Sequence, residues 1–183
     1  LVSPGAQSAL SAIVSTYTQP GDVIVTDRSA YPGIRTSASQ FDLILVGLDS
    51  DMEGMMPDQL DRVCSQHQPR LLYCIPTIHN PTTATMSLQR RKDILGVAQR
   101  HQMHIIEDDP YSLLLDHPLP ALAALDHGRV SYIATLAKTL SPGLRTAYVA
   151  LTLSLIHLPE PTRLRRISHA VFCLKKKTLF NSF

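Results

Sequence analysis

The chain has 183 residues, of which 44% are hydrophobic and 17% are charged, a composition typical of a globular domain with a buried core. No apolar run approaches the roughly 20 residues of a membrane-spanning helix, and no basic segment precedes an apolar stretch at the start. We therefore expect no membrane anchor and no secretory signal. The three cysteines and eight histidines lack metal-ligand spacing, which predicts no metal site and favours a reduced, cytoplasmic location.

The formal net charge of +2 is unevenly distributed along the chain. From Thr152 onward there are six basic residues and one acidic residue, so residues 1–151 hold 11 basic and 14 acidic residues. The basic character therefore belongs to the end of the chain. The main part gives no reason to expect nucleic-acid binding.

Strand-like and helix-like segments alternate through residues 1–151. In chain order, the pattern predicts a helix over 6–18, strands over 22–27 and 41–48, a helix over 57–67, a strand over 70–75, a helix from Ser87 to about Gln102, and strands over 104–108, 130–136 and 145–151. Such alternation predicts an α/β domain with three layers, in which helices cover both faces of a mostly parallel sheet.

Unusual polar residues follow the predicted strands, where ligands bind in sheets of this kind. These residues are Asn80, Asp108, Tyr111 and Lys138. Each has a simpler interpretation when taken alone: a turn asparagine, a capping or solvated acid, a half-buried aromatic residue and a surface lysine. A lysine that is desolvated at the end of a strand has a lowered pKa and becomes nucleophilic, but the segment around Lys138 does not by itself decide between these interpretations.

Three segments taken together indicate a protein family more specifically than any of these residues alone. Asn80–Thr82, Glu107–Tyr111 and Thr135–Arg145, in this order and at these spacings, resemble the fold type I aminotransferases of class I/II, which depend on pyridoxal 5'-phosphate (PLP). The resemblance covers residues 5–151. It implies that residues 1–151 form the large PLP-binding domain, truncated at both ends.

The resemblance also implies individual roles. Lys138 would hold the cofactor as a Schiff base and move a proton at the substrate α-carbon, and Asp108 would pair with the pyridine nitrogen. Asn80 and Tyr111 would hydrogen-bond the phenolic oxygen of the ring, and Tyr31 would stack on its face. The catalytic set is thus Lys138, Asp108 and Tyr111.

The phosphate of the cofactor needs donors and positive charge. Ala6 and Gln7 lie at a predicted helix start, where free N–H groups and the helix dipole favour an anion. Thr135 can add a hydroxyl, and Arg145 can add a charged guanidinium group. Arg145 taken alone could equally be an ion-pair residue.

Three residues depart from the pattern of many relatives. Thr83 replaces a glycine, Ala137 replaces a serine that could donate to the phosphate, and His79 replaces a glutamine. Asn80–Met86 together with Lys138–Arg145 resembles the MocR group. In that group a GntR-type winged helix precedes an aminotransferase-like domain.

This subgroup leaves two functions open. One is amino-group transfer between an amino acid and a 2-oxo acid, and the other is effector sensing by a transcription factor that uses the same chemistry without catalysis. A winged helix upstream of Leu1 would favour the regulator, and DNA would be bound only through such a domain. A pseudo-enzyme is disfavoured because the lysine, acid, tyrosine and asparagine are all present. For the full-length protein we expect a homodimer.

The end of the chain does not continue the α/β pattern. Ile167–Lys177 resembles the translation of a sequencing-library adapter that runs into poly-A, and Leu153–Arg163 resembles a peptide of the same origin. We therefore interpret residues 152–183 as a non-native read-through tail. The alternative is a genuine basic amphipathic tail that contacts a membrane or a nucleic acid.

Overall fold

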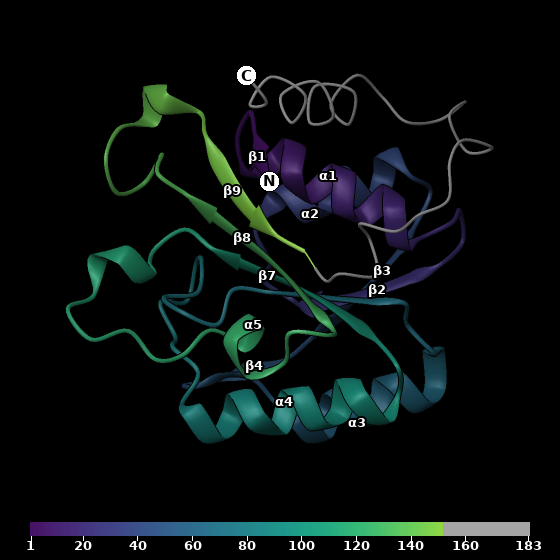
Figure 1. Cartoon of the computed structure of the whole chain (residues 1–183). Coiled ribbons are helices and arrows are strands. Elements are labelled where there is room, and N and C mark those ends of the chain that lie inside the picture. Colours follow the sequence, from purple (N-terminus) through teal and green to yellow (C-terminus); the bar gives the residue numbers. More distant parts are fainter. Residues whose placement is uncertain (152–183) are drawn as a thin grey trace.

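The computed structural model describes residues 1–151, which form the three layers that the alternating pattern predicts (Figure 1). Helices α1 (Ala6–Tyr17) and α2 (Pro32–Gln40) cover one face of a central sheet. Helices α3 (Pro57–His67), α4 (Leu88–Arg100) and the short α5 (Leu122–Leu125) cover the other. The interpretation of residues 152–183 as a tail concerns residues outside this range.

The sheet has seven strands in the order β1-β9-β8-β7-β6-β2-β3. The strands β2, β3, β6, β7 and β8 are parallel, whereas β9 runs antiparallel to both β8 and β1. The bounds are β1 (Val2–Ser3), β2 (Val23–Asp27), β3 (Ile44–Leu48), β6 (Leu71–Cys74), β7 (His104–Asp109), β8 (Val130–Thr135) and β9 (Ala147–Ala150). A separate two-stranded ribbon pairs β4 (Ser50–Asp51) with β5 (Gly54–Met55).

The sheet has a topological switch point between β2 and β6. The chain adds β3 on one side of β2 and then crosses to place β6, β7 and β8 on the other side. Ligands of open α/β sheets bind at such a switch point, beyond the carboxyl ends of the strands. Tyr31 follows β2 and Asn80 follows β6, so both lie in the connections that leave this point.

Each face of the sheet has its own hydrophobic core. On the side of α1 and α2, Leu10 and Ile34 pack with Tyr73, Ile106 and other strand residues. On the opposite side, residues of α3, α4 and α5 pack with Leu72 and Ile105. Because side chains alternate along a strand, neighbouring residues of β6 and β7 face different cores. This alternation decides which polar residues face the α1 side.

The structure departs from the predicted elements in a few places. The third predicted segment begins as a strand at Ile44 rather than residue 41, and the helix after Ser87 ends at Arg100. Helix α2 was not predicted: Tyr31 is its N-terminal flanking residue, not merely an aromatic residue in a turn. Among the described residues, no helix combines the length and apolarity needed to cross a membrane.

Candidate functional site

The acid Asp108 lies on β7 and is buried, with 6% of its surface exposed. Its Oδ2 accepts a hydrogen bond of 2.7 Å from the hydroxyl of Tyr73. Its Oδ1 is also buried but has no hydrogen-bond partner in the structure. Burial raises the pKa of Asp108 to about 6, against the opposing effect of the Tyr73 hydroxyl. A buried carboxylate oxygen without a partner is costly, so this oxygen marks a candidate ligand position on the sheet.

The two neighbouring acids are fully bonded. Both oxygens of Glu107 accept 2.9 Å hydrogen bonds from the N–H groups of Leu122 and Ala123, at the start of α5. Asp109 accepts from the backbone N–H of Ser112 at 3.0 Å and from the Tyr132 hydroxyl at 2.7 Å. Glu107 and Asp109 thus have the capping role that is the simpler interpretation of Asp108, and among these three acids only Asp108 keeps an oxygen without a partner.

Tyr31 packs against the core on the α1 side and is partly buried. Its ring and the side chain of Gln7 close over Gly33: a Cβ at this glycine would lie 2.2 Å from Cε1 of Tyr31 and 2.1 Å from Oε1 of Gln7. The amide of Gln7 donates to the Gly33 carbonyl at 3.0 Å and to Ser37 Oγ at 3.1 Å. The Gln7 side chain thus fixes α2 and Tyr31, which leaves only its backbone N–H as a possible anion donor.

The start of α1 lies at the carboxyl edge of the sheet. Ala147 pairs with Ser3 on β1 and with Thr135, the last residue of β8, so the three form one row across the strands. Helix α1 begins at Ala6, shortly after this row, and no side chain caps it. Its first N–H groups are therefore positioned to bind an anion near the end of β8.

Two further expected phosphate residues have different environments. The hydroxyl of Thr135 donates to the Thr146 carbonyl at 3.2 Å and accepts from the Ala137 N–H at 3.2 Å. It would have to rotate in order to donate to a phosphate. Arg145 is exposed, in left-handed conformation with φ 38°, and within residues 1–151 its guanidinium has no hydrogen bond or ion pair.

Lys138 lies in the turn that follows β8 and is exposed. The turn is closed by a 2.9 Å hydrogen bond from the Leu140 N–H to the Leu136 carbonyl. Strands β7 and β8 are parallel neighbours, with Asp108 opposite Ile133, so Asp108 and the Lys138 turn lie at the same edge of the sheet on adjacent strands. Their burial differs: the Asp108 side chain is buried, whereas Lys138 is exposed.

Asn80 is partly buried in the loop between β6 and α4, and its bond to Pro81 is cis. The preceding His79 is buried and anchors this loop: its Nδ1 lies 2.8 Å from Thr82 Oγ1, and its Nε2 lies 3.5 Å from Oδ2 of Asp27. The departure at position 79 thus has a structural partner at the end of β2. Tyr111 begins the turn after β7 and is also partly buried.

Two residues of this region were not singled out from the sequence, namely Tyr73 and Arg91. Arg91 is completely buried, donates to the Pro76 and Met86 carbonyls at 3.2 and 3.1 Å, and lies 3.9 Å from Glu107. It therefore holds both ends of the Asn80 loop. A tyrosine inside an apolar strand and an arginine on the apolar face of a helix were the available signals, because buried polar groups require partners.

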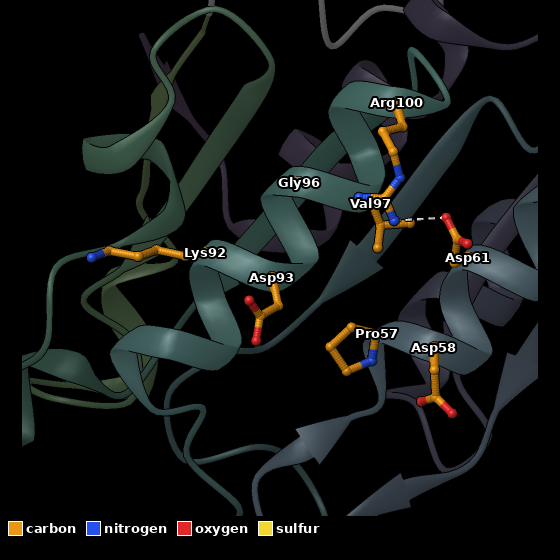
Figure 2. Close-up of a pocket in the computed structure, with 8 residues that line it drawn as sticks. All are labelled: Pro57, Asp58, Asp61, Lys92, Asp93, Gly96, Val97 and Arg100. Carbon is orange, nitrogen blue, oxygen red and sulfur yellow. Dashed lines mark hydrogen bonds and ion pairs between the residues drawn. The ribbon is translucent and has the colours of Figure 1, made fainter.

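A separate groove runs between α3 and α4 (Figure 2). It is lined by Pro57, Asp58, Asp61, Lys92, Asp93, Gly96, Val97 and Arg100. Arg100 already donates to Asp61 at 2.8 Å, and the groove lies on the face of the sheet opposite α1. It is therefore distinct from the cluster around Asp108. Among residues 1–151, no group of three His, Cys, Asp or Glu side chains is arranged to hold a metal ion.

Comparisons with known proteins assign the family. Residues 1–169 match the family model described as aminotransferase class I and II. The uncharacterized HTH-type transcriptional regulator YdeF of Bacillus subtilis is 40% identical over 150 residues, which cover 82% of this chain and 32% of that protein. The chain therefore belongs to the class I and II aminotransferase family, and its similarity extends to both enzymes and regulators.

Solved structures agree with this assignment. The multiple substrate aminotransferase of Thermococcus profundus has a TM-score of 0.78 at 32% identity, and the match covers 85% of this chain and 41% of that one. LysN, the α-aminoadipate aminotransferase of Thermus thermophilus, was crystallised with N-(5'-phosphopyridoxyl)-L-leucine; its TM-score is 0.80 at 27% identity, with coverage of 85% and 42%. The chain spans about a third of the length of the curated relatives that it matches.

Proposed function

We propose that this chain is the PLP-binding core of a protein that transfers an amino group between an amino acid and a 2-oxo acid. The observation that carries the proposal is the unpartnered Oδ1 of Asp108, beside the strand that leads to Lys138. The ring nitrogen of PLP carries a proton that suits such an acceptor. The family assignment and the phosphopyridoxyl ligand of LysN support the same cofactor.

The residues present fit this cofactor at each of its polar groups. The uncapped start of α1 suits the phosphate, with the N–H groups of Ala6 and Gln7 as donors and Arg145 as a nearby cation. Tyr31 offers an aromatic face on the same side of the sheet. Asn80 lies within the loop between β6 and α4, and Tyr111 follows the end of β7; both would donate to the phenolic oxygen.

When bound, PLP supplies an aldehyde that condenses with amines and a protonated ring that withdraws electrons from the adjoining carbon. Lys138 would provide the amine that anchors the cofactor. It would then take a proton from the substrate α-carbon and deliver it to the cofactor. Asp108 would hold the proton on the ring nitrogen. The fixed position of Asp108 within β7 requires no rearrangement for this role.

A second function is favoured by a specific observation, the 40% identity to an HTH-type regulator. In that case the same lysine and acid would hold PLP as a sensor of an amino-acid effector, and DNA would be bound by a domain outside this chain. The full-length protein would be expected to form a homodimer in either case. Turnover of an amino acid with a 2-oxo acid by the full-length protein, as opposed to binding alone, distinguishes the enzyme from the sensor.

The cofactor assignment is tested with PLP, borohydride reduction and peptide mapping by mass spectrometry. We expect a visible absorbance band on addition of PLP and a reduced adduct on Lys138, which is lost in Lys138→Ala. Lys92 is the other lysine of residues 1–151 and lies on α4 on the opposite face, so Lys92→Ala is the matched control and should keep the adduct. Equal labelling of Lys138→Ala and the unmodified protein would show that another amine holds the cofactor.

A further inference from the structure

Tyr73 is one of the largest fully buried side chains of the protein, and its hydroxyl is bonded to Asp108. We infer that Tyr73 is a positioning residue, which holds the Asp108 carboxylate so that Oδ1 is kept for the cofactor nitrogen. This inference rests on the proposed function. It assigns a role to a residue that touches neither the cofactor nor a substrate in our proposal.

The geometry supports this role in two ways. Tyr73 lies on β6 and Asp108 on the neighbouring β7, and both face the core beside α1 and α2, the side that also carries Tyr31. The terminal torsion of an aspartate is broad and roughly two-fold, so an isolated carboxylate exchanges its oxygens freely. A 2.7 Å bond to Oδ2 selects one orientation and leaves Oδ1 as the remaining acceptor.

The bond also acts on the charge of Asp108. Burial favours the neutral acid, and the neighbouring Asp109 raises the pKa of Asp108 further. The donated hydrogen bond from Tyr73 favours the ionised form, which is the form that a protonated ring nitrogen needs. Burial and the neighbouring Asp108 hold the pKa of the Tyr73 hydroxyl well above its usual value, so this hydroxyl keeps its proton and acts as the donor.

A second tyrosine–aspartate pair supplies the contrast. Tyr132 on β8 donates to Asp109 at the same 2.7 Å, but the other oxygen of Asp109 already accepts from the Ser112 N–H. That pair is complete and serves the turn after β7. The Tyr73–Asp108 pair is incomplete, and the missing partner is what the proposed cofactor would supply.

The experiment measures PLP affinity by absorbance titration in Tyr73→Phe, Asp108→Asn and the double variant. Because hydrogen bonds to charged groups are among the stronger ones, Tyr73→Phe should weaken PLP binding about tenfold in the parent protein. In the Asp108→Asn background the same change should alter affinity by less than about twofold, since the two residues act together. Tyr132→Phe, the matched control, should leave affinity unchanged in both backgrounds.

Equal weakening by Tyr73→Phe in both backgrounds would overturn the inference, because it would show a structural role independent of Asp108. A second measurement does not depend on the cofactor: carbon-13 NMR of the Asp108 carboxyl should show a raised pKa in Tyr73→Phe and no change in Tyr132→Phe. An unchanged Asp108 titration in Tyr73→Phe would also overturn it. Failure of the proposed function has a different signature, the absence of a Lys138 adduct in the unmodified protein.

Discussion

The buried acids of β7 have different hydrogen bonding on the two faces of the sheet. Glu107, Asp108 and Asp109 are consecutive buried acids on β7, and the alternation of the strand sends the middle one to the α1 side and the outer two to the α4 side. On the α4 side both oxygens of Glu107 and both oxygens of Asp109 accept a hydrogen bond. On the α1 side Oδ1 of Asp108 accepts none.

This difference separates a face whose buried acids are bonded within the chain from the face that carries the proposed cofactor site. On the α4 side the acids accept hydrogen bonds from the loop after β7 and from helix α5, and Glu107 lies near Arg91. Burial still raises the pKa of Glu107 to about 7, so these bonds satisfy its oxygens without removing the cost of burying its charge. On the α1 side Asp108 carries a similar cost and also has an oxygen that no group of residues 1–151 bonds. Buried polar groups without partners are rare in folded proteins, and they concentrate where binding or catalysis requires them. The comparison can be tested one face at a time.

The largest effect is expected on the α4 side. Arg91→Met should lower the free energy of unfolding by about 3–5 kcal/mol, because it leaves Glu107 buried without its cation and frees the carbonyls of Pro76, Met86 and Pro120. Urea denaturation followed by circular dichroism measures the change. Arg100→Met is the control: it breaks the exposed pair with Asp61 and should cost about 1 kcal/mol or less. Similar losses in the two variants would refute the structural role of the α4 face.

A substitution at Asp108, on the α1 side, should stabilise the protein rather than destabilise it. Asp108→Asn should raise the stability of the cofactor-free protein at pH 8, since it removes a buried charge that has no complete set of partners. The pKa of Asp108 is raised to about 6 from 3.8, so the folded state holds its proton more tightly and stability falls as pH rises from about 4 to above 6. The gain should be on the order of 3 kcal/mol at pH 8 and should vanish near pH 4.

Asp109→Asn is the matched control for this change. It replaces an acid whose two oxygens are both bonded, so stability at pH 8 should stay the same or fall. Thermal melts of both variants at pH 4 and pH 8 give the comparison. If Asp108→Asn destabilised the protein at pH 8 as much as Asp109→Asn does, Asp108 would be a structural acid like its neighbours.

The fold was largely accessible from the sequence, for a physical reason. The buried strands of a parallel sheet are short apolar runs, and β2, β6, β7 and β8 were all predicted within two residues of their ends. Helix α2 was not predicted because its sequence has almost no hydrophobic periodicity. Its buried face consists of Gly33, Ile34, Ser37 and Ala38. Gly33 lies directly against Gln7 and the ring of Tyr31, and such close packing is not visible in a local sequence pattern.

The candidate site was accessible only in part. Asn80, Asp108 and Lys138 stand out because they follow predicted strands and match a family pattern, and their roles remain predictions. The contacts that distinguish Asp108 from its neighbours join residues far apart in sequence, such as Tyr73 with Asp108 and Glu107 with Leu122. Which of three consecutive acids lacks a partner is a property of the folded chain alone.

The smallest effect concerns how tightly each face is packed. A Cβ at Gly33 on α2 would lie 2.2 Å from the Tyr31 ring, whereas one at Gly96 on α4 would meet only the end of Arg100 at 3.9 Å. Gly33→Ala should therefore cost about 1–3 kcal/mol and weaken PLP binding, because the ring of Tyr31 must move. Gly96→Ala should stabilise the protein by about 1 kcal/mol or less, through helix propensity, and leave PLP binding unchanged. If Gly33→Ala bound PLP normally, Tyr31 would not be the residue that stacks on the ring, and the α1 face would be defined by Asp108 without it.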